Sequence, residues 1–220
     1  MAAVIEEHDA ATESRKRVSE RGPFEVFTNT KINRPGPRRP VDPNAVADYF
    51  EHSDLAEKHG EQPVREKIAQ MVESIQGGSA VTVLFSQNSP GGMSLVHAWF
   101  GPNFPLFAHS HPRYGDCLYY VVAGEAILGK RRLGPGAGFF VPNGHPYKYT
   151  AGPAGVEVLE FRAGGGEPGA PGMKLDEHSL SSLQRLIERA HENQDSWEAP
   201  ENIGDTAFRQ AELKRSADEG

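Results

Sequence analysis

The sequence predicts a mainly β domain, a small antiparallel barrel or sandwich with helices before and after it in the chain. Short runs rich in β-branched and aromatic residues recur at even spacing between residues 80 and 161. Clusters of Gly, Pro and Asn separate these runs, as in 101–103, 134–136 and 142–144. Short strands of even spacing with turn residues between them are typical of sandwiches and barrels.

The strands themselves are expected where apolar and polar residues alternate or where a short apolar run lies between turns. In residues 80–86 the period is two, with Val81, Val83 and Phe85 on one face. The other expected strands cover residues 94–100, 106–111, 117–122, 126–128, 139–141, 146–150 and 156–161.

Helices are expected on both sides of this region. Asp42-Pro43 is a helix start, with an N-cap residue followed by Pro at the first helical position, and a short helix should follow to about residue 50. A second helix is expected over 62–76, because its apolar residues follow the helical period and Gly77-Gly78 ends it. A third is expected at about 180–190, where the apolar residues are again at helical spacing.

The domain organisation follows from these elements. Residues 1–40 are poor in apolar residues and rich in Pro near their end, so we expect a flexible N-terminal arm. Residues 41–78 form a helical region packing on the barrel, and residues 79–162 form the barrel. Residues 163–220 comprise a Gly/Pro linker, the C-terminal helix and a polar tail.

Composition excludes several classes of protein. The net charge of -7 and the pI of about 5.7 argue against binding to a phosphate backbone, so we expect no nucleic acid partner. No apolar run reaches the ~20 residues of a membrane span, and the polar start of the chain has no signal-peptide pattern. Cys117 is the single cysteine, which rules out an intrachain disulfide. We therefore expect a cytoplasmic protein without a membrane partner.

The triplet His109-Ser110-His111 is the most informative chemical feature. Residues two apart in a strand point to the same face, so both imidazoles can reach one point inside a small barrel. Two imidazoles that converge in this way are candidate ligands of a metal ion. A single histidine in the same place would more often be an ordinary core residue.

The surroundings of this triplet resemble the two sequence motifs of the cupin superfamily. The stretch HSHPRYGDCLYYVVAGEAILG, residues 109–129, resembles the first motif, and GAGFFVPNGHPYKYT, residues 136–150, resembles the second. Gly124 closes the first motif, and Gly136, Pro142 and Gly144 fall on the second. The resemblance implies a cupin-type double-stranded β-helix, a jelly-roll barrel with a central cavity. It also implies a homodimer, since cupins are often dimers.

The motifs are degenerate at the remaining ligand positions. The family's Glu ligand has two counterparts here, because counting from His111 leads to Asp116 and counting back from Gly124 leads to Cys117. The family's third His falls on Tyr147, and His145 stands two residues earlier. The resemblance therefore implies His109 and His111 as metal ligands, with the other ligands open among Asp116, Cys117, His145 and Tyr147.

Other residues are candidates for the pocket. By strand parity, Tyr119, Tyr147 and Tyr149 share the inner face with the histidines, and Tyr119, Tyr147 or His145 could act as a proton donor or hydrogen-bond donor. His97 and Trp99 lie two apart in the preceding strand and could line the cavity. Phe139 is expected in the core or the pocket wall.

Two functions are open at this point. The first is a metal-dependent cupin enzyme acting on a small organic molecule. The resemblance implies a dioxygenase-like oxidoreductase more often than an isomerase or a lyase. The enzyme would use a divalent first-row metal, Fe(II) first and otherwise Zn, Ni or Mn. The second is a non-catalytic cupin that has lost its metal site and binds a small ligand in its barrel.

Overall fold

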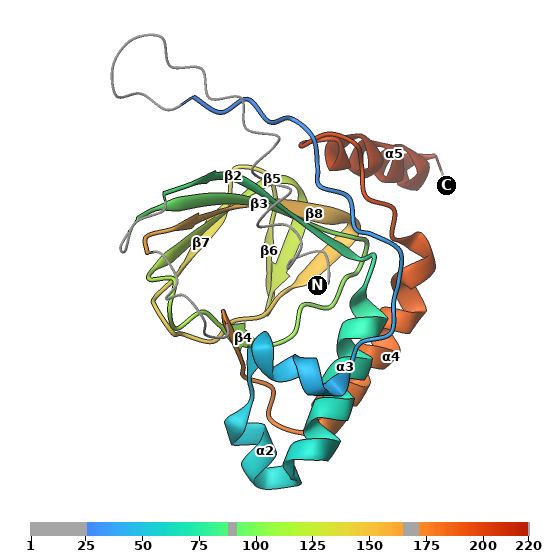
Figure 1. The fold of residues 1–220 in the computed structure, drawn as a ribbon. Helices are drawn as coiled ribbons and strands as arrows, with labels where there is room; N and C mark the ends of the chain where they lie inside the picture. The colour runs from blue at the N-terminus through green and yellow to red at the C-terminus, as the bar shows by residue number, and fades with distance from the viewer. Residues whose placement is uncertain (1–25, 88–91, 165–171, 220) are drawn as a thin grey trace.

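A computed structural model describes residues 26–87, 92–164 and 172–219 (Figure 1). The expected arm at 1–40 therefore lies partly, and the Gly/Pro linker largely, outside the described residues. The first elements are the 3-10 helix η1 (Pro43–Asp48), the short strand β1 (Phe50–Glu51) and the helices α2 (Ser53–His59) and α3 (Glu61–Ile75). The Asp42 side chain accepts a hydrogen bond from the Asn44 amide, as expected of an N-cap.

The β domain consists of two sheets. The larger sheet has the strand order β2-β3-β8-β5-β6, and β7 also pairs with β5. The smaller sheet has the order β1-β9-β4, in which β1 and β9 are parallel. The remaining strand bounds are β2 (Ser79–Ser86), β3 (Ser94–Phe100), β4 (His109–Ser110), β5 (Cys117–Leu128), β6 (Arg131–Leu133), β7 (Gly138–Val141), β8 (Thr150–Arg162) and β9 (Met173–Leu175).

The central strands are longer than the sequence predicts. The two short strands expected at 117–122 and 126–128 form one strand, β5. Strand β8 runs through residues 151–155, including Gly152-Pro153, which separate the strands expected at 146–150 and 156–161. Register shifts in the β5–β8 ladder bend both strands while the pairing continues. Gly124 lies at one shift with a φ of 72°, and a Cβ there would come within 2.2 Å of a backbone oxygen. The bend therefore requires glycine.

The pairing register divides the larger sheet into an inner and an outer face. Tyr119 lies opposite Glu160, and Glu160 lies opposite Val96, so these three side chains share the inner face. Both sheet faces are buried in places, because the C-terminal part of the chain covers part of the outer face. Trp99, on that outer face, packs with Ile32 and Ala199 in a small hydrophobic cluster of its own.

The helices cover the barrel from two sides. Figure 1 shows α3 beside α4 (Leu180–Asn193), and their apolar faces enter the main core through residues such as Ile68 and Leu183. Ser179 and Ser182 form a capping box at the start of α4. The 3-10 helix η2 (Gln194–Ser196) follows, and α5 (Thr206–Asp218), which the sequence does not predict, packs on β8 and β5.

Candidate functional site

A cavity of about 370 Å³ lies between the two sheets. The larger sheet contributes Glu160 and Arg162 to its lining, and the segment of β4 contributes His109 and His111. Among its other lining residues are Ser79, Val81, Phe100, Phe104, Leu106, Phe107, Tyr114, Tyr147 and Met173. A small, mostly apolar cavity with a few polar groups is the usual form of a small-molecule site.

Strand β4 and the residue that follows it carry the two histidines. His109 pairs with Leu175 of β9 in the smaller sheet, and it also forms an isolated bridge with Tyr147. The two imidazole centroids are 4.9 Å apart, and residues His109 and His111 are 4% and 8% exposed to solvent. The sequence prediction that both side chains converge on one cavity therefore agrees with the geometry.

Backbone carbonyls fix the orientation of both rings. His109 Nδ1 lies 3.0 Å from the Phe107 carbonyl oxygen, and His111 Nδ1 lies 3.2 Å from the Gly172 carbonyl oxygen. A carbonyl only accepts hydrogen bonds, so each Nδ1 carries the hydrogen and donates it. Each Nε2 is therefore left with a lone pair. Histidines that bind metals are oriented by the same kind of hydrogen bond.

Both histidines are neutral at physiological pH. Burial lowers the pKa of His109 to about 3, and the neighbouring His111 lowers it further. Burial also lowers the pKa of His111 to about 3, and the positive charge of Arg162 acts in the same direction. The Nε2 atoms therefore act as acceptors or ligands, and neither ring supplies a proton at pH 7.

Two tyrosines join this pair. The hydroxyls of Tyr119 and Tyr147 are 2.6 Å apart, and the Tyr147 hydroxyl lies 3.4 Å from His111 Nε2. Since His111 Nε2 can only accept, Tyr147 donates to it and Tyr119 donates to Tyr147. Burial raises the pKa of both phenols well above the usual range, so both stay protonated. Tyr147 lines the cavity, and Tyr119 supports it from behind.

A buried ion pair completes the lining. An Arg162 Nη atom donates to the Glu160 carboxylate over 2.6 Å, and the two side chains are 17% and 8% exposed. Neither residue was predicted from the sequence, although the spacing of the two carries a signal. Glu160 and Arg162 lie two apart at the end of a mainly apolar strand, so parity places both on one face.

Three of the expected ligand candidates lie away from the cavity. Asp116 and His145 are exposed, and the Asp116 carboxylate accepts a hydrogen bond from the Asn143 amide. Cys117 is buried in the core beside this region but does not line the cavity. Burial raises the pKa of its thiol, which favours the protonated form. Tyr147 is the one candidate of the four that lines the cavity.

His97 and Trp99 lie on the outer face of β3, contrary to the expectation that they line the pocket. The His97 Nε2 atom is 2.8 Å from the Glu157 carboxylate, and both side chains are fully buried. The same carboxylate accepts hydrogen bonds from the amides of Gly204 and Thr206. His97 thus belongs to the contact that holds the C-terminal segment.

Phe139 and Tyr149 form the aromatic packing next to the cavity rather than its wall. Phe139 stacks on Tyr119 with ring centroids 4.7 Å apart. Tyr149 packs edge-on against Phe100, and its hydroxyl is buried without a hydrogen-bond partner among the described residues. Phe139 thus packs on the tyrosine that supports Tyr147, and Tyr149 packs beside Tyr147 itself, with ring centroids 6.4 Å apart.

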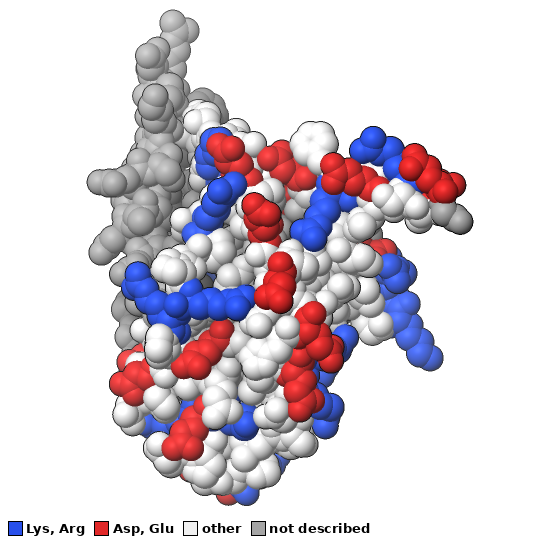
Figure 2. Space-filling view, turned by 90° about the vertical axis from the view of Figure 1, so that its right-hand side faces the viewer, with Lys and Arg blue, Asp and Glu red and all other residues white. Residues whose placement is uncertain are grey.

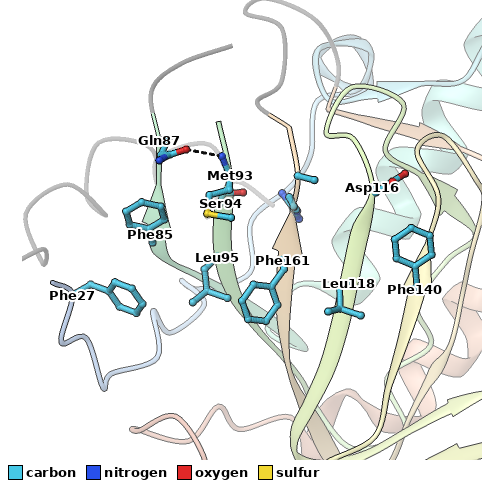
Figure 3. A pocket seen from close by; sticks show the side chains of 12 residues that line it. Phe27, Phe85, Gln87, Met93, Ser94, Leu95, Asp116, Leu118, Phe140 and Phe161 are labelled. Atoms are coloured by element: carbon cyan, nitrogen blue, oxygen red, sulfur yellow. Dashed lines mark hydrogen bonds between the residues drawn. The ribbon is translucent and has the colours of Figure 1, made fainter. Parts of the chain in front are cut away.

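A second hollow, of about 770 Å³, lies on the outer face of the larger sheet. Figure 3 shows Phe27, Leu118, Phe140 and Phe161 along it, with Asp116 at one end. Leu118, Phe140 and Phe161 are between 42% and 58% exposed. Contiguous apolar surface of this kind marks an interaction surface more often than a catalytic site.

The charged residues on the helical side of the molecule do not form a field of one sign. Figure 2 shows Lys and Arg interspersed with Asp and Glu over this face. Such a mixture lacks the basic stripe that tracks a phosphate backbone. Within the residues described, no helix is long and apolar enough to cross a membrane.

The two imidazoles fit a metal ion, and the rest of the set fits it in part. Both rings are neutral with Nε2 unprotonated, as metal binding requires, although His111 Nε2 accepts the 3.4 Å hydrogen bond from Tyr147. In the part of the chain that the structure describes, however, no three His, Cys, Asp or Glu side chains are grouped so that they could hold a metal ion. A bound metal would therefore be held by His109 and His111, and Tyr147, the remaining predicted candidate that faces the cavity, stays protonated beside them.

Comparison with known proteins gives matches among solved structures. An RmlC-like cupin from Shewanella frigidimarina is 24% identical, with a TM-score of 0.36, over 41% of this chain and 80% of that one. KdgF from a Halomonas species is also 24% identical, with a TM-score of 0.35, over 40% of this chain and 82% of the other. The polyketide cyclase RemF from Streptomyces resistomycificus is 18% identical, with a TM-score of 0.37, over 60% and 83%. No protein-family model and no curated protein matches the chain.

The protein has the cupin fold, a double-stranded β-helix with flanking helices, as the sequence motifs predicted. Its strands enclose the cavity that carries His109 and His111. A fold by itself does not assign a reaction.

Proposed function

We propose that the protein is a metal-dependent enzyme that acts on a small organic molecule in the cavity between the two sheets. One observation carries the proposal. The neutral imidazoles of His109 and His111 each donate the Nδ1 hydrogen to a backbone carbonyl, so neither Nε2 atom carries a hydrogen. An ordinary core histidine needs no such matched partner on the same face.

The metal is a divalent first-row ion, with Fe(II) favoured and Zn, Ni or Mn as the other candidates. Such an ion supplies Lewis acidity toward a carbonyl or hydroxyl of the substrate and, for iron, the capacity to react with O2. A dioxygenase-like oxidation remains the favoured reaction, because a metal ion held by two imidazoles would keep coordination positions free for O2 and the substrate.

The chain's own residues then have separate tasks. Tyr147 holds its proton at the cavity wall and donates a hydrogen bond into the site, and Tyr119 positions that hydroxyl. The Glu160–Arg162 pair supplies the charged part of the lining. The aromatic walls exclude water from the bound molecule.

Metal analysis of protein purified without a His tag tests the proposal. The wild type should contain a first-row metal near one equivalent, and the variant His109→Ala/His111→Ala should lose it. The control is His178→Ala/His191→Ala, which removes two exposed histidines and should keep the metal. Circular dichroism should show that both variants are folded. Equal metal content in both variants, or none in the wild type even after incubation with Fe(II) or Zn(II), would refute the proposal.

The second candidate is a non-catalytic cupin that binds a small ligand without metal. It is favoured by the lack of a third grouped ligand in the described parts of the chain and by the engagement of Glu160 with Arg162. Protein that contains no metal and still binds a small molecule in this cavity would support it.

A homodimer is part of the proposal. The exposed apolar side chains on the outer face of the larger sheet, among them Leu118, Phe140 and Phe161, support a contact with a second copy there. Burial of these side chains would remove apolar surface that the monomer leaves in water.

A further inference from the structure

Arg162 has more donor capacity than its known partner uses. A guanidinium has five N–H groups, and Arg162 gives one hydrogen bond to Glu160. Its Nε is buried without a hydrogen-bond partner among the described residues. A buried donor that lacks an acceptor is costly, which favours an additional acceptor at this guanidinium.

Tyr114 holds the guanidinium toward the histidines. The Arg162 Cζ lies 4.9 Å from the centroid of the Tyr114 ring, and that ring packs against His111 at 5.6 Å. All three side chains line the same cavity. An acceptor that binds Arg162 would therefore lie next to the imidazole pair.

The charge of the cavity permits one further anionic group. The charges of Glu160 and Arg162 balance each other. Arg162 keeps its proton: burial lowers the pKa of its guanidinium, but the nearby Glu160 more than offsets this effect. A metal ion on the histidines would add positive charge, so an anion would be favoured with or without metal.

The remaining walls select the body of the molecule. Phe100, Phe104, Phe107 and Tyr147 supply aromatic surface, and the cavity of about 370 Å³ is at the small end of the range for ligand sites. A planar carboxylate matches the planar donor fork of arginine, and it adds less negative charge beside Glu160 than a phosphate would.

We propose that the ligand of this site is a small aromatic or apolar carboxylate, and that Arg162 binds its carboxylate group while the apolar body lies toward His109 and His111. The inference rests on the proposed small-molecule site and names its substrate class. Glu160 limits the affinity, because it occupies one side of the guanidinium and repels a second carboxylate.

Calorimetric titration of the full chain in EDTA tests this proposal without any contribution from metal. The probes are 3-phenylpropanoate, its amide, 2-phenylethylamine and phenyl phosphate. The carboxylate should bind about 10- to 100-fold more tightly than the amide, as expected for a charge-assisted hydrogen bond. Equal binding of acid and amide, or tighter binding of the amine or the phosphate, would overturn the assignment.

Variants of the ion pair make the test specific. Glu160→Gln should tighten carboxylate binding roughly three- to tenfold, because a neighbouring like charge is removed. Arg162→Met/Glu160→Gln, which leaves no unpaired buried charge, should abolish the preference for acid over amide. Arg131→Met, on the exposed strand β6, should change nothing. Weaker carboxylate binding by Glu160→Gln, or an acid preference that survives in the double variant, would contradict the proposal.

The two proposals can fail separately. Arg162-dependent carboxylate binding by protein that never takes up metal would leave this inference standing and refute the enzyme. Metal uptake at His109 and His111 together with equal binding of acid and amide would do the reverse.

Discussion

Replacement of Glu157 by glutamine should release the C-terminal segment from the outer face of the barrel. The Glu157 side chain is fully buried. One carboxylate oxygen accepts from His97 Nε2 at 2.8 Å and from the Gly204 amide at 2.6 Å, and the other accepts from the Thr206 amide at 2.9 Å. Burial raises the pKa of this carboxyl, but these hydrogen bonds outweigh burial and lower the pKa overall. The group is therefore ionised in the folded protein.

The size of the effect follows from the geometry. An amide has one accepting oxygen, so its NH2 group must oppose at least one of the three N–H donors. In the better orientation the oxygen keeps His97 and Gly204, while the Thr206 amide loses a charge-assisted hydrogen bond and stays buried without an acceptor. These two losses together should cost about 3 to 5 kcal/mol.

Urea unfolding and amide hydrogen exchange measure this loss. The midpoint should fall for Glu157→Gln, and amides at the start of α5 should exchange faster than in the wild type. The control is Glu125→Gln, which alters a surface ion pair with Arg132 and should have little effect. Unchanged exchange in α5, or equal loss in the two variants, would show that the carboxylate does not anchor this segment.

Three further predictions concern the histidines, the bend in β5 and the outer face. In EDTA, lowering the pH from 7 to 5 should reduce the free energy of unfolding by about 2 kcal/mol for each of His109 and His111, because the unfolded rings take up protons near pH 6.5 and the folded ones only near pH 3. Urea unfolding should show a correspondingly smaller fall for His109→Gln/His111→Gln than for the wild type. An identical fall in both proteins would contradict the assigned pKa values. Gly124→Ala should lower the thermal midpoint more than Gly129→Ala, since both glycines have positive φ but a Cβ meets backbone only at Gly124; equal shifts would argue against the close approach. Phe140→Glu should shift a dimer to a monomer in sedimentation equilibrium, and a wild type that is already monomeric would contradict the proposed interface.

The barrel could be predicted from the sequence because its strands carry a local signal. Alternation in residues 80–86 and the turn residues around Gly136 and Pro142 specify strand and turn without reference to the rest of the chain. The long strands β5 and β8 could not be delimited in this way. The positions of their bends depend on the strand with which each one pairs. The Gly152-Pro153 pair, seen in the sequence alone, indicates a turn, but in the structure the pairing with β5 continues on both sides of it.

The candidate site was predicted in part, for a similar reason. Parity alone places His109 and His111 on one face, but it does not say which face is the inner one. His97 and Trp99 obey the same parity and lie outside, because the C-terminal segment buries the outer face of β3 as well. Glu160 was missed because the sequence does not show that its strand pairs with the strand of Tyr119.

Anomalous scattering at the Fe, Ni, Cu and Zn edges, from crystals of untagged protein soaked in the metal, would locate a bound metal ion directly. We expect a single strong peak in the cavity between the sheets, about 2.0 to 2.2 Å from the Nε2 atoms of both His109 and His111. Peaks confined to exposed histidines, or imidazoles rotated away from the cavity, would contradict it.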